Sequence, residues 1–300
     1  MGNKNPIIKN ISEASINRIL QKLNSLSDKE KISFLKEQTP PFPRYLYKYR
    51  AISNDTSKER IKQIAIDSKF FLSSPESFND PFDMKCKWVI EGSAFQTRER
   101  LKNLFKSLGN SRREIDEKLP RAVVTLRENP DKILGDSVKK AVNSSGVLSL
   151  SKIPHNILMW SHYSDCSKGI CLQFDVIKDP DTFMKAARVR YNDTYPVINW
   201  LENNIQNPFR EALLQKSTHW SYEQEHRIIE PGSANAHLSF KPESLVGIIF
   251  GVSISQESID FITELLEERF SKGWNKPNLI KCHTHKEKYA LLLYKYITSQ

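Results

Sequence analysis

Long hydrophobic runs are missing from this sequence. No uninterrupted apolar segment approaches the roughly 18 residues that a membrane-spanning helix needs. The N-terminal residues also lack the apolar core of a secretory signal, and Pro6 stands where a lipidation motif has Ser or Thr. We therefore expect a cytoplasmic protein that has no membrane partner.

Cysteine patterns that bind metals are also missing. No two of the four cysteines form a C-x-x-C pair; they are Cys86, Cys166, Cys171 and Cys282. The polar residues Asn79, Asp80 and Asp83 are too few for a calcium loop and do not have its spacing. We therefore expect a reduced protein with no structural zinc and no other bound metal.

The chain contains neither of the two glycine motifs that hold phosphates. Neither G-x-G-x-x-G nor a Walker motif occurs, which argues against a Rossmann-type dinucleotide fold and against a phosphate-loop NTPase. A nucleotide ligand would need another kind of site.

The bulk composition is that of an ordinary globular protein. Of the 300 residues, 39% are hydrophobic and 27% charged, and this length allows one large domain or two small ones. The formal net charge of +10 favours anionic partners, such as nucleic acid, a phosphorylated cofactor or an acidic protein. The basic residues are spread out, however, and no aromatic–basic RNA-recognition motif occurs.

The segment of residues 157–175 is the most informative part of the chain. Trp160, His162 and Tyr163 lie within four positions of one another, directly before a polar turn at residues 165–169. The alternation that follows, through residues 170–175, predicts a strand with one buried face. An imidazole and a phenol beside such a turn suit a small-molecule pocket. The alternative is that the aromatic rings are core and that His162 makes a structural hydrogen bond.

Residues 1–40 are predicted to be a helical appendage. Ser12 is a plausible N-cap for a first helix that ends near Leu23, and Ser27 with Glu30 forms a capping box for a second helix through about Lys36. The prolines of residues 39–43 end this second helix. A lid over the core is the simpler role for the appendage, and a partner-binding arm is the alternative.

Residues 41–300 are predicted to be a single α+β domain with an inserted helical lobe at about 95–143. Its central sheet is expected to be split and mostly antiparallel, because short strands follow one another without regular βα alternation. We expect strands at residues 45–50, 69–73, 146–150, 170–175, 188–191, 245–250, 279–282 and 289–296. We expect further helices at residues 59–67, at 197–216 and after Ser255, and an ordered loop at 75–83 anchored in the core by Phe78 and Phe82.

The segment of residues 222–228 carries a pair of carboxylates and a guanidinium. If it is extended, Glu223, Glu225 and Arg227 project on one face. These groups could form a structural ion-pair network. Alternatively, one carboxylate faces a substrate while Arg227 orients the other.

Three stretches together resemble a bacterial family of unknown function, number 2971, over roughly residues 44–296. They are Leu46-Tyr-Lys-Tyr-Arg50 with Phe78-Asn-Asp-Pro-Phe-Asp83, Leu158-Met-Trp-Ser-His-Tyr163 with Gly169, and Trp220-Ser-Tyr-Glu-Gln-Glu-His-Arg227. Each piece alone is common, but the combination is specific.

The order of the polar residues is also similar, more distantly, to the ADP-ribosyltransferase superfamily. There, an Arg or His on the first strand holds NAD and a late Glu polarises the nicotinamide ribose. This resemblance assigns the first element to Arg50, the second to Ser73 and Ser74, and the third to Glu223 with Glu225. The chain departs from the pattern by reading Leu-Ser-Ser-Pro at the second element and by its large helical insertion. His162 and Tyr163 have no secure counterpart.

The resemblance implies an enzyme that consumes NAD, either a transferase or a glycohydrolase. A bacterial toxin or a phage-defence effector is the biological role that goes with such an activity. Glu225 would then be the main catalytic residue, with His162 and Tyr163 also catalytic, in one shared cleft. The residues expected to bind NAD are Tyr49, Arg50, Ser73, Trp160, Glu223 and Arg227. A nucleic acid or a protein is the expected acceptor.

Two other functions fit the same residues. One is a metal-independent nuclease or phosphodiesterase, in which His162 works with Glu225 and Arg227. The other is a non-catalytic module that recognises a nucleotide or a protein.

Whatever the function, Trp160 is predicted to be largely buried, because it follows Leu158 and Met159 in the most apolar part of its segment.

Overall fold

A computed structural model describes residues 20–38, 41–202, 210 and 212–296 of the chain. These residues form two compact units, each assembled from separate segments. Unit 1 takes residues 20–68, 152–185 and 239–296, and unit 2 takes residues 69–151 and 186–238. The chain therefore passes between the units four times. The single domain expected over residues 41–300 stays a prediction.

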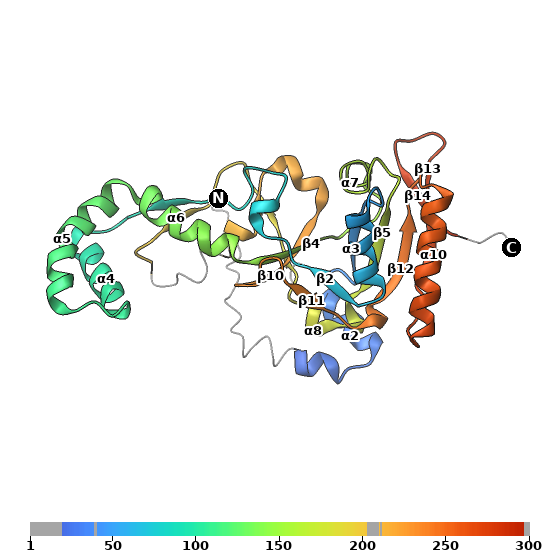
Figure 1. The fold of residues 1–300 in the computed structure, drawn as a ribbon, viewed down its shortest axis with the longest axis horizontal. Helices are drawn as coiled ribbons and strands as arrows, with labels where there is room; N and C mark the ends of the chain where they lie inside the picture. Colours follow the sequence, from blue (N-terminus) through green and yellow to red (C-terminus); the bar gives the residue numbers. More distant parts are fainter. Residues whose placement is uncertain (1–19, 39–40, 203–209, 211, 297–300) are drawn as a thin grey trace. The chain divides into compact units, whose positions relative to one another are not determined.

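Unit 1 contains a five-stranded set in the order β14-β13-β12-β5-β1. Four of these strands, β14, β13, β12 and β5, are labelled in Figure 1. These strands are β1 (Tyr45–Arg50), β5 (Ile170–Asp175), β12 (Leu245–Phe250), β13 (Asn278–Thr284) and β14 (Leu291–Lys295). All neighbours are antiparallel except β12 and β13, which are parallel. The sequence predicts β1, β5 and β12 with these bounds, because their alternating or continuous apolar patterns are local signals.

The helices of unit 1 begin at side-chain caps that the sequence supplies. They are α2 (Asp28–Glu37), α3 (Asp55–Ala65), α7 (Ile157–Tyr163), α8 (Pro180–Phe183) and α10 (Gln256–Ser271), with short 3-10 turns η2 (Val176–Lys178) and η4 (Pro242–Ser244). Ser27 and Glu30 form the predicted capping box of α2. Helices α3 and α10 pack against each other (Figure 1).

Unit 2 contains a second, smaller antiparallel set in which β10 lies between β4 and β6. These strands are β4 (Gly146–Ser151), β6 (Ala187–Arg188) and β10 (Glu225–Glu230). Three strand pairs complete the unit: β2 (Lys69–Phe71) with β11 (His237–Ser239), β3 (Lys87–Val89) with β8 (Val197–Asn199), and β7 (Arg190–Tyr191) with β9 (Gln215–Lys216). A 3-10 turn, η1 (Pro75–Ser77), follows β2.

The helical lobe expected at residues 95–143 is present in unit 2. It consists of α4 (Ala94–Ser107), α5 (Arg112–Glu128) and α6 (Pro130–Asn143), drawn in green in Figure 1. Helices α4 and α5 begin at capping boxes, as Ser93 pairs with Gln96 and Ser111 with Glu114. Leu101 of α4 and Leu119 of α5 share one hydrophobic core with Trp88 of β3.

The helix predicted over residues 197–216 is wrong at both of its ends. Val197–Asn199 is strand β8, which pairs in parallel with β3, and Gln215–Lys216 is strand β9. Val197 and Ile198 are β-branched and prefer the extended conformation when a partner strand is available. That partner lies far away in the sequence, so local spacing could not reveal it.

Two other expectations about unit 2 are also wrong. Phe82 does not anchor its loop in the core, because its side chain is 63% exposed, whereas Phe78 packs against the core as expected. The extended segment expected at residues 222–228 begins only at Glu225. Before it, Thr218–Glu223 forms a 3-10 helix, η3, and Gln224 is left-handed with φ of 44°.

The architecture is therefore α+β, with mostly antiparallel strands, as predicted. The N-cap at Ser12 and the first turns of the N-terminal helix lie outside the described residues, while residues 20–24 are helical. In the part of the chain that is described, no helix combines the length and apolar character needed to cross a membrane.

Candidate functional site

The predicted site residues fall into two groups. Tyr49, Arg50, Trp160, His162 and Tyr163 belong to unit 1, and Ser73, Glu223, Glu225 and Arg227 belong to unit 2. The expectation that residues from both groups line one cleft stays a prediction. Each group is therefore described within its own unit.

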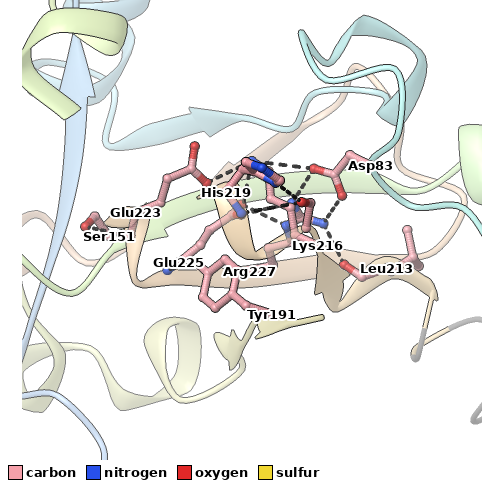
Figure 2. A network of polar contacts seen from close by, with 10 residues as sticks. Asp83, Ser151, Tyr191, Leu213, Lys216, His219, Glu223, Glu225 and Arg227 are labelled. Atoms are coloured by element: carbon pink, nitrogen blue, oxygen red, sulfur yellow. Dashed lines mark hydrogen bonds and ion pairs between the residues drawn. The ribbon is translucent and has the colours of Figure 1, made fainter. Parts of the chain in front are cut away.

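Arg227 is the centre of a buried charge cluster in unit 2, formed by Asp83, Lys216, Glu223, Glu225 and Arg227 (Figure 2). Its side chain is fully buried on β10. Its Nε and Nη2 donate to the two Glu225 oxygens at 2.7 and 2.9 Å. Its Nη1 and Nη2 donate to the two Asp83 oxygens at 3.0 and 2.6 Å, and Nη1 also donates to the Leu213 carbonyl at 2.8 Å. These bonds use all five N–H donors of the guanidinium.

Lys216, on β9, is the second cation of the cluster. Its ammonium donates to Glu223 Oε2 at 2.8 Å, and it lies 3.7 Å from Asp83 Oδ2 and 3.8 Å from Glu225 Oε2. It also lies 4.5 Å from the centre of the Trp220 ring, which adds a cation–π contact. Lys216 thereby contacts every carboxylate of the cluster.

Glu225 and Arg227 hold each other in the charged form although both side chains are almost completely buried. Burial alone would raise the pKa of Glu225, but the charge and hydrogen bonds of Arg227, with the charge of Lys216, lower it to about 2. Burial would likewise lower the pKa of Arg227, but the charges of Glu225 and Asp83 raise it. Three carboxylate side chains face two cationic side chains here, which is a formal excess of one negative charge.

Backbone contacts fix the two glutamates on either side of a sharp turn. The Glu225 N–H donates to the Tyr191 hydroxyl at 2.8 Å, and the Ser151 hydroxyl donates to the Glu223 carbonyl at 2.7 Å. The left-handed Gln224 lies between them. Glu223 therefore reaches the cluster from the end of η3. The prediction that Glu223 shares an extended strand with Glu225 is wrong.

A cavity of about 520 Å³ lies next to this cluster within unit 2. Lys216 belongs to both, because its side chain also lines the cavity. The cavity is lined by Asn79, Asp80, Pro81, Phe82, Lys85, Asn192, Asp193, Thr194, Tyr195, Pro196, Gln215, Lys216, Ser217, His219 and Trp220. Three aromatic rings and several hydrogen-bonding groups thus surround one space of ligand size.

Two hydrogen-bonded pairs stand at the edge of this cavity. The Ser217 hydroxyl and His219 Nδ1 lie 2.9 Å apart, and the Thr218 hydroxyl donates to Asp193. The hydrogen bond from Thr218 is the main cause that lowers the pKa of Asp193. All four side chains therefore already have a hydrogen-bond partner in the structure.

In unit 1, two of the predicted aromatic residues, Tyr49 and Trp160, are buried. Trp160 is 1% exposed, as predicted, and its Nε1 donates to the Pro154 carbonyl at 2.8 Å. The Tyr49 ring meets the Trp160 ring edge-on at 5.2 Å, and the Tyr49 hydroxyl donates to the Ile153 carbonyl. Both rings therefore hold α7 to β1.

The polar residues predicted in unit 1 differ in their surroundings. His162 is an exposed residue of α7, and its ring lies 6.4 Å from that of Tyr163. Arg50 ends β1, and its buried Nε has no hydrogen-bond partner among the described residues. Burial and then the nearby charge of Arg60 lower the pKa of Arg50 to about 10. In unit 2, Ser73 forms an isolated bridge with Val147 just beyond β2.

The sequence did not single out three residues that matter at this site, namely Asp80, Asp83 and Lys216. Both aspartates stand in the Asn-Asp-Pro-Phe-Asp loop, where the sequence excludes a calcium site and indicates a family resemblance but assigns neither aspartate a role. Lys216 has no distinguishing local pattern, since its carboxylate partners come from other elements. Within the described ranges, no group of three or more His, Cys, Asp or Glu residues is arranged to hold a metal ion.

Comparison with known protein families gives a match over part of the chain. The model of a family described as a protein of unknown function (DUF2971) matches residues 159–228. This stretch runs from α7 to β10 and includes Lys216, Glu223, Glu225 and Arg227. No curated protein and no solved structure matches the chain.

Proposed function

We propose that this chain binds NAD in the cavity of unit 2 and cleaves the bond between nicotinamide and ribose. The observation that carries the proposal is the position of Lys216. This residue lines the cavity and is bonded to a buried cluster with one more carboxylate than cations. The site thus joins a nucleotide-sized space, through Lys216, to a cluster whose formal excess charge is negative.

The size and lining of the cavity support a nucleotide ligand. Its volume of about 520 Å³ falls in the range of roughly 300–1,000 Å³ that is usual for small-molecule sites. Phe82 and Tyr195 are 63% and 44% exposed, so each ring has exposed surface for stacking with a flat ring, although Lys85 lies over the Phe82 ring at 5.4 Å. Lys85, which also lines the cavity, can meet a phosphate as a point charge.

The electrostatics of the cluster support cleavage of the glycosidic bond. As nicotinamide leaves, positive charge builds on the ribose, and fixed negative charge nearby stabilises that transition state. The cluster supplies such a charge in an environment where Arg227 keeps Glu225 ionised. It needs no reorganisation during the reaction, because hydrogen bonds already hold both cations.

The proposal also includes the fold and the residue roles that the sequence predicts. The fold is that of the ADP-ribosyltransferases, and Glu225 is the main catalytic carboxylate, assisted by Glu223. Contributions of Tyr49, Trp160, His162 and Tyr163, and of Ser73, stay predictions. Arg50 is a candidate for holding an anionic group, because its buried Nε has no partner in the described part of the chain. A nucleic acid or protein acceptor, and a role in toxicity or phage defence, follow from the proposal.

The test is to incubate the protein with NAD and to measure both binding and nicotinamide release. Phe82→Ala removes an exposed aromatic ring from the cavity wall and should weaken NAD binding about tenfold, the typical value of a stacking contact. Phe95→Ala is the matched control. Phe95 is 70% exposed on α4 and does not line the cavity, so this variant should bind NAD normally. No NAD binding by the wild type would overturn the proposal.

A non-catalytic nucleotide-binding module is the second candidate. It is favoured by the fact that both carboxylate oxygens of Glu225 are already bonded to Arg227. NAD binding without nicotinamide release would support this candidate. The nuclease alternative is supported less well, because the five donors of Arg227 are all engaged and leave none for a phosphate. Degradation of labelled RNA or DNA would revive it.

A further inference from the structure

Asp80 is a buried carboxylate of the cavity wall whose two oxygens have different surroundings. The residue is 7% exposed and lines the cavity. Its Oδ1 accepts a hydrogen bond from the Phe82 N–H at 2.9 Å. Its Oδ2 is buried and has no hydrogen-bond partner among the residues that the structure describes. One oxygen therefore fixes the loop, and the other lacks a donor.

A buried carboxylate oxygen without a donor is unusual. Nearly all buried polar atoms in folded proteins have a hydrogen-bond partner, and an exception calls for a missing water or ligand. The two lysines of the cavity do not form a described ion pair with Asp80. Lys216 is bonded to Glu223, and Lys85 lies over the Phe82 ring at 5.4 Å. A water or a ligand hydroxyl group in the cavity that Asp80 lines can supply this donor.

The chemistry of a carboxylate limits which ligand group can approach Asp80. It repels a phosphate, and it accepts hydrogen bonds from hydroxyl groups. In a nucleotide, the ribose hydroxyls are the donors that lie between the ring and the phosphate. Phe82, whose N–H already holds Asp80, supplies an exposed aromatic face two residues away. Ring and sugar can thus be held by one loop.

We infer that Asp80 is the residue that binds a ribose hydroxyl of the nucleotide, and that the cavity is specific for ribonucleotides. This inference rests on the proposed function, because it places a nucleotide in the cavity. It assigns to Asp80 a role in binding and specificity, which is separate from the role of the Glu225 cluster in the chemistry.

The experiment compares affinities for NAD with those for four NAD analogues, each lacking the 2′ or the 3′ hydroxyl of one ribose. Calorimetric titration of the wild type should show that at least one analogue binds about 10- to 100-fold more weakly than NAD, as for a hydrogen bond to a charged group. Asp80→Asn replaces the free acceptor by an amide donor. It should bind NAD more weakly by the same factor and no longer distinguish that analogue.

Asp193→Asn is the matched control. Asp193 also lines the cavity, but its carboxylate already accepts hydrogen bonds from the Thr218 N–H and hydroxyl. This variant loses one negative charge from the same cavity and should still distinguish the analogues as the wild type does. If Asp80→Asn does not fold, Asp80→Ser serves instead, because a Ser hydroxyl can accept from the Phe82 N–H.

The possible outcomes separate this inference from the proposed function. If the wild type binds NAD and all four analogues equally, or if the Asp80 variant still distinguishes them, Asp80 does not bind the ribose and the proposed function stands. If the wild type binds no NAD, the proposed function and the inference both fall. Loss of discrimination in Asp80→Asn alone supports the inference.

Discussion

Asp83 and Arg227 are joined by two hydrogen bonds of 3.0 and 2.6 Å across a sequence separation of 144 residues. The same guanidinium holds Glu225 through two more bonds. This arrangement ties the loop after η1 to strand β10. A buried and fully bonded arginine thus adds a side-chain link to the strand pairs that join the two sequence segments of unit 2.

Replacing Arg227 should destabilise the protein strongly. Arg227→Met keeps most of the side-chain volume but leaves Glu225 and Asp83 buried without their main counter-ion. We expect a loss of about 3–5 kcal/mol in the free energy of unfolding, as for other broken buried ion pairs. Urea denaturation measures it, with the exposed Arg113→Met as a control that should change stability by less than about 0.5 kcal/mol. A loss below about 1 kcal/mol for Arg227→Met would show that the cluster is not structural.

Acid should weaken the fold through Glu225. The pKa of Glu225 is lowered from an ordinary value near 4.5 to about 2 in the folded state. The native state therefore binds fewer protons, and the resulting stability is present above about pH 4.5 and is lost as the pH falls toward 2. The difference corresponds to about 3 kcal/mol. Denaturation from pH 7 to pH 2 should show a smaller loss in Glu225→Gln than in the wild type; equal losses would contradict the assignment.

Gly169 and Gly135 should respond oppositely to the same substitution. An added Cβ at Gly169 would lie 2.1 Å from the Arg50 carbonyl oxygen, so Gly169→Ala should cost at least about 2 kcal/mol. Gly135 lies inside α6, and among the described residues no atom lies within 4 Å of a Cβ added there, so Gly135→Ala should stabilise the protein by about 1 kcal/mol. Thermal melting of the two variants tests the pair. A stable Gly169→Ala would mean that β1 and the turn before β5 can separate.

Trp160 should be a major contributor to stability even if it never touches a ligand. Trp160→Ala removes a fully buried ring together with its contact to Tyr49 and its hydrogen bond to Pro154. The expected cost is about 3–5 kcal/mol. Leu158→Ala in the same helix is the control, since Leu158 is 45% exposed and should cost much less. Equal melting temperatures for Trp160→Ala and the wild type would disprove this role.

Features with a local cause could be predicted from the sequence. Strand β12 follows from a continuous apolar run, and the burial of Trp160 follows from its apolar neighbours. The placement of Glu225 and Arg227 on one face follows from the two-residue period of a strand. In each of these cases, neighbours within a few positions contain the whole signal.

Features that depend on distant partners could not be predicted in this way. Strand β8 forms because β3, far back in the sequence, pairs with it. The left-handed conformation at Gln224 could not be predicted, because no glycine stands there to indicate it. This turn moves Glu223 out of the strand. Asp83 and Lys216 belong to the charge cluster because three segments that are separate in the sequence meet in the fold. The periodicity of each segment does not show that they meet.

The division of unit 2 into two sequence segments has a consequence for synthesis on the ribosome. Asp83 emerges 144 residues before Arg227, and a ribosome adding about 5–20 residues per second needs about 7–30 seconds to supply the partner. Until then, the Asp83 carboxylate cannot enter an apolar interior without a large desolvation cost. The nascent loop after η1 must therefore stay hydrated while the helical lobe, which follows it in the sequence, is synthesised and folds. A chain that pauses in this interval would expose the part of the cavity wall that carries Asp80 and Phe82.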